Sequence, residues 1–135
     1  TRYKPTIGWI GYHPSLLPRH RGRSSIEWAI KMRDFLTGGT TFWLNSGIDR
    51  GDIIEQEIVW IDPKMYNMHI KKAARLLWEH ELQDIGVRLI NKTINDIVNG
   101  TVKRRPQDNR FSTLETSLNV KDIFRPDALM LNEKN

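Results

Sequence analysis

The 135 residues are enough for one domain with a real core, and their composition, 39% hydrophobic and 27% charged, is typical of a globular protein. The chain has no cysteine, so it has no disulfides, thiolate metal ligands or cysteine nucleophile. It shows no export signal and no run of about 18 apolar residues, so it is expected to be cytoplasmic and not to span a membrane. The net charge of +5 suits an anionic partner, but the cations do not alternate with aromatic residues, so direct nucleic-acid binding is not expected.

The first half of the chain alternates strand-like and helix-like segments. Ser24 or Ser25 can cap a helix that ends near residue 33, because serine side chains accept hydrogen bonds from the first free N–H groups of a helix. The pair Gly38 and Gly39 is expected to break this helix. β-Branched and aromatic residues are typical of strands, and they predict strands over residues 6–12, 40–44 and 52–61.

A long helical segment over residues 67–99 is the best-defined element. Its apolar residues recur at helical spacing, which predicts that one face packs in the core. Asn67 can serve as the N-cap, and Gly100 is placed to end the segment. Gly86 is expected to kink it, so the segment is either one long helix or two joined near this glycine.

A histidine and an aspartate follow predicted strands. His13 comes at the end of the first strand and opens a loop that is bracketed by two prolines and rich in cations. Asp49 lies in a glycine-flanked turn between the two later strands. A histidine and an aspartate held at strand ends suit proton transfer or stabilisation of an oxyanion. This pairing favours an enzyme.

Other polar residues leave alternatives open. Arg19 and Arg21 can contact an anionic substrate or can be solvated loop charges, and His20 can contact such a substrate or be exposed and inert. His69 and His80 are not at the spacing of metal ligands, so the sequence predicts no metal site.

A family resemblance rests on two stretches of the sequence. One reads His13-Pro14-Ser15-Leu16-Leu17-Pro18 and is followed by Gly22; the other reads Asp49-Arg50-Gly51-Asp52. They resemble the histidine segment and the aspartate turn of the formyltransferases that use 10-formyltetrahydrofolate. The wider strings, YHPSLLPRHRG and FWLNSGIDRGDIIEQ, are particularly similar to the hydrolase domain of 10-formyltetrahydrofolate dehydrogenase.

The resemblance implies an α/β fold with a formyltransferase-type, Rossmann-like sheet flanked by helices. Only one predicted strand precedes the histidine loop, so either the fold is small or the chain is the C-terminal part of a larger one. The resemblance implies the second alternative, in which the chain supplies the C-terminal half of this fold. Residues 1–106 would form the C-terminal part of a formyltransferase-like catalytic domain. Residues 107–135 would form an irregular tail that can hold a short helix around residues 121–124.

The resemblance also implies an activity: transfer of the formyl group of 10-formyltetrahydrofolate to an amine or to water. His13 would support the tetrahedral intermediate, and Asp49 would orient the histidine or a water and relay protons. Gly51 would let the turn bend tightly behind Asp49. The remaining loop positions implied by the resemblance are Pro14, Ser15, Leu16, Leu17, Pro18 and Gly22.

Gly11 departs from the family pattern. In most transferases of the family, an asparagine at this position donates to the developing oxyanion. Loss of one such donor typically costs about 100- to 1,000-fold in rate. The glycine favours two readings: an enzyme that uses water as the acceptor, or an impaired relative that binds a ligand or partner without turnover.

The partners implied by the resemblance are a folate and a formyl acceptor. The acceptor stays open among sugar amines, glycinamide ribotide, initiator methionyl-tRNA and water. Association with a missing N-terminal half, or with a second copy of the chain, is also expected.

Overall fold

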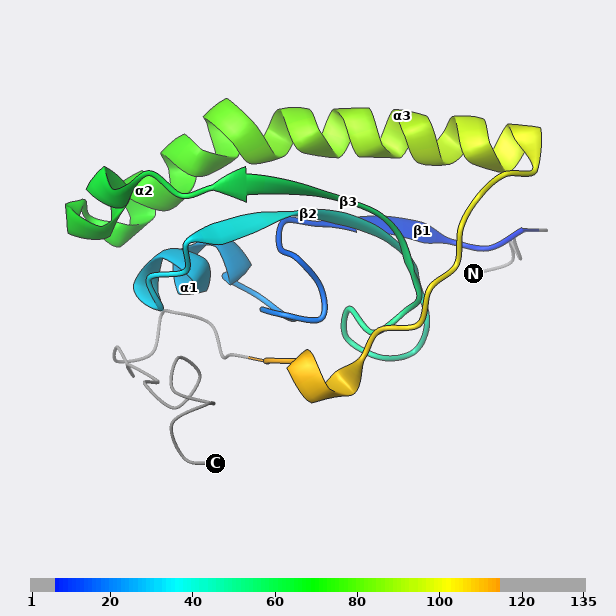
Figure 1. The fold of residues 1–135 in the computed structure, drawn as a ribbon, viewed down its shortest axis with the longest axis horizontal. Coiled ribbons are helices and arrows are strands. Elements are labelled where there is room, and N and C mark those ends of the chain that lie inside the picture. Colours follow the sequence, from blue (N-terminus) through cyan, green and yellow to red (C-terminus); the bar gives the residue numbers. More distant parts are fainter. Residues whose placement is uncertain (1–6, 115–135) are drawn as a thin grey trace.

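A computed structural model describes residues 7–114, which are arranged in layers around a small sheet (Figure 1). The strands are β1 (Ile10–His13), β2 (Leu36–Trp43) and β3 (Ile53–Trp60), and the α-helices are α1 (Ser25–Lys31), α2 (Ile70–Leu77) and α3 (Gln83–Asn99). The three strands are antiparallel neighbours in the order β1-β2-β3. Helix α3 covers one face of the sheet, α2 packs on α1 beyond the ends of the strands, and the loop after β1 lies on the other face.

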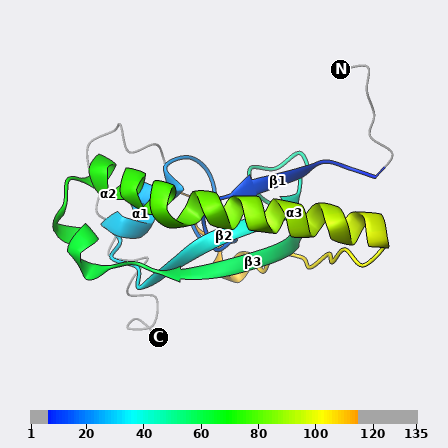
Figure 2. The ribbon, with the colours of Figure 1, turned by 90° about the horizontal axis from the view of Figure 1, so that it is seen from above.

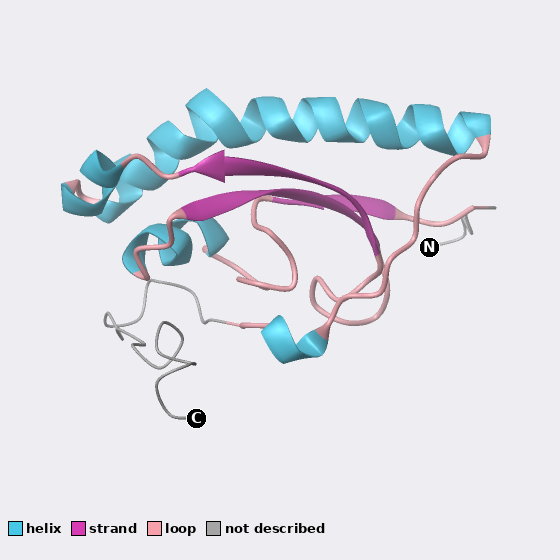
Figure 3. Ribbon diagram, viewed as in Figure 1, coloured by secondary structure: helices cyan, strands magenta, loops and turns pink. Residues whose placement is uncertain are grey.

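The expected α/β fold, with a sheet flanked by helices, is confirmed (Figure 3). The strand predicted over residues 52–61 corresponds to β3. The first predicted strand is shorter than expected, and β1 ends on His13 itself. The short helix predicted around residues 121–124 lies outside the described residues. Within residues 7–114, no helix has the length and apolar character needed to cross a membrane.

The prediction that Gly38 and Gly39 break a helix is wrong. Helix α1 has already ended at Lys31, and both glycines lie inside β2. A β-carbon at Gly39 would lie 2.3 Å from the hydroxyl oxygen of Tyr12, and one at Gly38 would lie 2.0 Å from the carbonyl oxygen of Glu57. These glycines therefore allow β1 and β3 to approach β2 closely.

The predicted helical segment is divided by a π-helical turn, Trp78–Leu82, between α2 and α3. The segment is thus two helices, but they join before Gly86, which lies inside α3. The expected N-cap is wrong, because His69 caps α2 in place of Asn67. The predicted end is confirmed, since Gly100 adopts the left-handed conformation with φ of 72°. Seen from above, α3 lies over the strands and α2 lies over α1 (Figure 2).

Tyr12 attaches this helix layer to the sheet. Its hydroxyl donates to the carbonyl oxygen of Leu82 at 2.6 Å, and burial, followed by the nearby charge of Glu57, raises the pKa of the phenol. Gly86 makes room for the ring, because a β-carbon there would lie 2.8 Å from Tyr12 Cε2. One buried core cluster joins α1, the residue after β3 and the helix layer, and consists of Ala29, Ile30, Ile61, Ala73, Ala74, Leu77, Leu82, Ile85 and Leu89.

Candidate active site

Alternation along β1 places His13 on the face away from the helix layer. Neighbouring residues of a strand point to opposite faces. Tyr12 contacts the helices, so Gly11 and His13 face the loop after β1. His13 is 7% exposed, and its Nδ1 lies 3.4 Å from Asp49 Oδ2. The structure thus brings together the histidine and the aspartate that the sequence singled out.

Asp49 is fixed through both its carboxylate and its backbone. Its Oδ2 accepts a hydrogen bond from the Gly22 N–H at 2.8 Å. The Gln107 side-chain amide donates to the carbonyl oxygens of Asp49 and Gly51, each at 2.7 Å. Asp49 adopts a left-handed conformation, with φ of 52°, which few residues other than glycine tolerate. These contacts aim the carboxylate at His13.

Gly51 is required by a close backbone approach. A β-carbon at this position would lie 1.4 Å from the carbonyl oxygen of Trp43. The turn is closed there by the Trp43 N–H, which donates to the carbonyl oxygen of Asp52 at 2.9 Å. No side chain fits between these two segments, so the sequence can place Asp49 in this turn only with glycine at position 51.

The second ring nitrogen of His13 contacts the backbone. Nε2 lies 2.7 Å from the carbonyl oxygen of His20. A carbonyl oxygen only accepts hydrogen bonds, so the hydrogen-bond network assigns a proton to Nε2. Nδ1 is then the nitrogen that faces Asp49.

The loop from Pro14 to Pro18 is held by polar contacts from two strands. Thr40 Oγ1 donates to the Ser15 carbonyl at 2.7 Å and accepts from the Leu17 N–H at 3.2 Å. The Gln56 amide donates to the Leu17 carbonyl at 2.9 Å. The Leu17 side chain packs with Phe42 and Ile53. Ser15 Oγ donates to the Arg19 carbonyl at 2.7 Å, and the Leu17–Pro18 peptide bond is cis.

The loop cations contact groups of the chain itself. Arg19 donates to both carboxylate oxygens of Asp34, at 2.8 and 2.7 Å. Arg21 is 4% exposed and donates to the side-chain oxygens of Gln107 and Asn109. Burial, followed by the charge of Arg50, lowers the pKa of Arg21. The role of these arginines as substrate contacts stays a prediction.

His20 is not exposed, which corrects one of the two alternatives drawn from the sequence. His20 is 1% exposed, and its Nε2 donates to Asp34 Oδ2 at 2.7 Å. Ser24 stands at the N-cap of α1 as expected, but its side chain makes no capping hydrogen bond there. The Ser25 hydroxyl instead donates to the carbonyl of Pro14 at 3.3 Å, which ties α1 to the histidine loop.

Gly11 leaves no side-chain donor beside His13. A β-carbon at this position would lie 3.1 Å from Leu44 Cδ2 and 3.3 Å from the ring of Phe42. A larger residue here would therefore require these two side chains to move by a few tenths of an ångström.

Asp34, Thr40 and Gln107 were missed by sequence reasoning. Asp34 lies after α1, Thr40 in β2 and Gln107 after α3, and Gln107 bonds a backbone group 58 positions away. No local pattern marks such residues, because their partners are set by the fold.

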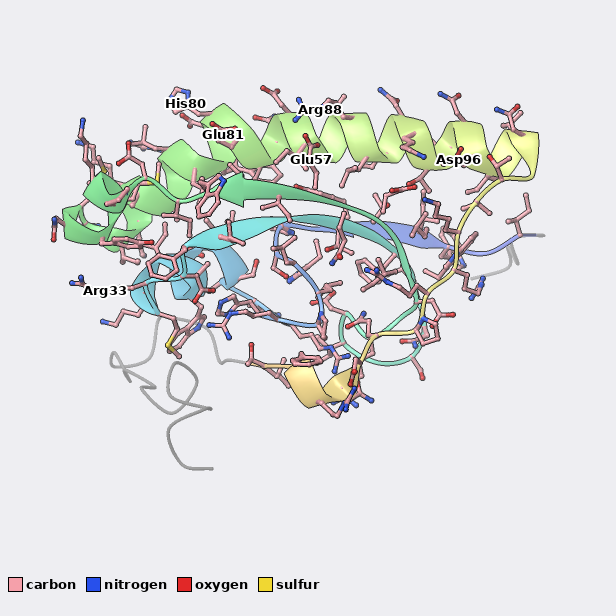
Figure 4. The ribbon with its side chains drawn as sticks, viewed as in Figure 1. Arg33, Glu57, His80, Glu81, Arg88 and Asp96 are labelled. Atoms are coloured by element: carbon pink, nitrogen blue, oxygen red, sulfur yellow. The ribbon has the colours of Figure 1, made fainter. Side chains whose placement is uncertain are left out.

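Among residues 7–114 no group of three His, Asp or Glu side chains could hold a metal ion, and His80 points away from the sheet (Figure 4).

Comparisons with known proteins identify the family. The formyl transferase family matches residues 3–82, more than half of the chain, so this chain belongs to that family. It is 42% identical over 105 residues to a methionyl-tRNA formyltransferase of Azobacteroides pseudotrichonymphae genomovar. CFP2, a match that covers 77% of the chain and 30% of that protein. It is 36% identical over 128 residues to the cytosolic 10-formyltetrahydrofolate dehydrogenase of Mus musculus, covering 95% of the chain and 13% of that protein.

A solved structure supports the same assignment. The N-formyltransferase from Helicobacter canadensis, crystallised with folinic acid and dTDP-3-aminofucose, superposes with a TM-score of 0.67 at 25% identity. The match covers 83% of this chain and 39% of that one. The chain thus spans between 13% and 39% of the length of these three proteins.

Proposed function

We propose that this chain supplies the catalytic histidine and aspartate of an enzyme that moves the formyl group of 10-formyltetrahydrofolate to an amine or to water. The observation that carries the proposal is the approach of His13 Nδ1 to Asp49 Oδ2 at 3.4 Å. The two residues come from separate motifs of a formyl transferase family member, and both are held by backbone contacts. Such preorganisation is what a proton-transfer pair requires.

The reaction divides into addition and collapse. In addition, the lone pair of the acceptor forms a bond to the formyl carbon, and the carbonyl electrons move to the oxygen. His13, in its protonated form, stabilises this oxyanion by its positive charge while Asp49 takes the proton lost by the acceptor. In collapse, the electrons of the oxyanion re-form the carbonyl, the bond from the formyl carbon to folate N10 breaks, and N10 receives the proton held by Asp49. The products are tetrahydrofolate and either a formylated amine or formate.

The acceptor is proposed only as a class. The relatives are named for methionyl-tRNA formylation and for 10-formyltetrahydrofolate oxidation, and the Helicobacter canadensis structure contains an amino-sugar nucleotide. An amine and water therefore both fit the family. Gly11 favours water, because most transferases of the family carry an asparagine at this position.

A second candidate is an impaired relative that binds folate without turnover. Gly11 favours it, and so does the limited access to His13, whose side chain is 9% exposed. The chain also matches only part of each relative, so further segments can be needed for a complete folate site.

A paired experiment separates the two candidates. Tetrahydrofolate is titrated into the 135-residue chain by calorimetry, and formyl release from 10-formyltetrahydrofolate is measured with the same preparation. Binding with release that is lost in His13→Ala and in Asp49→Ala supports the enzyme. Binding without release supports the impaired relative, and neither binding nor release contradicts both.

A further inference from the structure

A buried ion cluster lies beside the histidine loop. The Asp34 carboxylate accepts two hydrogen bonds from Arg19, at 2.8 and 2.7 Å, and one from His20 Nε2, at 2.7 Å. The side chains of Asp34 and His20 are 8% and 2% exposed. Burial alone would raise the pKa of Asp34, but the hydrogen bonds from Arg19 and His20 outweigh it and lower that pKa. Asp34 is therefore an ionised anchor at neutral pH.

The anchor is itself fixed to α1 and to the segment before α2. The Asp34 N–H donates to the Ala29 carbonyl at 3.0 Å, which places Asp34 directly after the helix. The Tyr66 hydroxyl donates to the Asp34 carbonyl oxygen. The carboxylate thus has a defined position before it contacts the loop.

His20 links this anchor to His13. The backbone of His20 is left-handed, with φ of 56°, a conformation that is uncommon for residues other than glycine. In this conformation its carbonyl oxygen lies 2.7 Å from His13 Nε2, while its N–H donates to Thr113 Oγ1 at 2.8 Å. The side-chain bond to Asp34 holds the residue from the other side.

We infer that Asp34 is a positioning residue for His13: by holding the His20 side chain, it fixes the carbonyl that binds His13 Nε2 and so keeps Nδ1 directed at Asp49. The inference rests on the proposed function of His13. Asp34 touches neither His13 nor any reacting atom in this arrangement; its effect passes through the His20 backbone. A residue with a purely structural role would support folding without determining which nitrogen of His13 carries the proton.

The test reads the ring nitrogens of His13 directly. Nitrogen-15 NMR at alkaline pH, where free imidazole is neutral, reports which ring nitrogen is protonated, and the spectrum of His13→Asn assigns the signals. The wild-type chain is expected to show the Nε2–H form. In Asp34→Asn the two shifts should move toward those of free imidazole. For formyl release, kcat should fall roughly 100-fold with KM unchanged, as expected for a misplaced catalytic group.

A second variant keeps the test decisive if Asp34→Asn does not fold. His20→Gly removes the side-chain link but retains a residue that adopts the left-handed conformation without strain. It should produce the same change in the His13 shifts. Unchanged shifts of both His13 ring nitrogens in every folded variant would overturn the inference.

The matched control removes a carboxylate that also binds an arginine through both oxygens. Glu57 accepts from Arg88 at 2.9 and 3.3 Å and lies at the helix-covered face of the sheet (Figure 4). Glu57→Gln should leave the His13 shifts unchanged, and an equal change there would overturn the inference. The NMR readout needs no turnover. A wild-type chain without formyl release would therefore count against the proposed function, while the shifts would still decide the role of Asp34.

Discussion

At the scale of single residues, His13 is held by both of its ring nitrogens. One contacts the His20 carbonyl and the other faces Asp49. His20 and Asp49 both have positive φ angles, so two uncommon backbone conformations flank the same imidazole. Such conformations persist where the surrounding contacts determine them, and they are common at functional sites.

Gly51 provides a test of the aspartate turn. Gly51→Ala would place a β-carbon 1.4 Å from the Trp43 carbonyl oxygen, so the backbone must shift. We expect a loss of about 3 kcal/mol in the free energy of unfolding, the upper end of the cost of overpacking, measured by urea denaturation. Gly47→Ala is the control in the same loop, because its β-carbon meets only the flexible, exposed side chain of Arg50. A cost below about 0.5 kcal/mol is expected there, and equal costs at both positions would contradict this account.

Asp34 should make the stability of the chain depend on pH in the acid range. Its folded-state pKa lies below the ordinary value of 3.8, so its contribution is present above that value and is lost as the pH falls through the folded-state pKa. At neutral pH, Asp34→Asn should cost about 3 kcal/mol, as expected for a broken buried ion pair. Urea unfolding at several pH values should show this difference shrinking below about pH 4. A difference that stays constant down to about pH 2 would contradict the lowered pKa.

The two catalytic candidates could be predicted from the sequence, whereas their supports could not. His13 and Asp49 stand out because each follows a strand within a local motif. Gln107 and Asp34 carry no such mark. Their roles arise from contacts with segments that only the folded chain brings near, such as the bond from Gln107 to the Asp49 carbonyl.

At the scale of elements, a polar contact joins the helix layer to the centre of the sheet. Thr41 on β2 and Thr93 on α3 are fully buried, and their hydroxyl groups lie 2.9 Å apart. Both side chains are buried, so each hydroxyl depends on the other for its hydrogen bond. This contact joins α3 to β2.

A double-mutant cycle tests the threonine pair. Thr41→Val and Thr93→Val should each cost about 1–3 kcal/mol in the free energy of unfolding, because each leaves one buried hydroxyl unpaired. The double variant should recover most of this cost, since it removes both polar groups. Additive losses in the double variant would show that the hydroxyl pair is not the cause.

Element types were easier to predict than element ends. Helical spacing marks residues 67–99, yet neither the π-helical turn at Trp78–Leu82 nor the role of Gly86 has a local signal. Glycine usually weakens helices and strands, so Gly38 and Gly39 suggested a break. Both glycines instead serve packing against neighbouring strands, which a single sequence does not display.

At the scale of the whole molecule, the segment after α3 returns to the histidine loop. Arg105 pairs with Ile53, and Gln107 and Thr113 bond to the aspartate turn and to His20. Residues 107–114, expected from the sequence to belong to an irregular tail, therefore contact both halves of the site. The His13 loop lies between the sheet and this segment (Figure 1).

Two truncated chains measure the contribution of this segment. A chain ending at residue 106 lacks the bonds from Gln107 and Thr113 that a chain ending at residue 114 retains. At about 1 kcal/mol for each hydrogen bond, the shorter chain should be at least about 3 kcal/mol less stable by urea unfolding. Equal stability of the two chains would show that residues 107–114 do not hold the site.

The central claim is that His13 and Asp49 act together on the formyl group, and a kinetic cycle tests it most directly. Formyl release from 10-formyltetrahydrofolate is measured for the wild-type chain, His13→Ala, Asp49→Ala and the double variant. Residues that work as a unit give non-additive losses. We predict that each single variant loses at least about 100-fold in kcat and that the double variant is no slower than the slower single one. Release that is absent from the wild-type chain, or equal in all four proteins, would contradict the account.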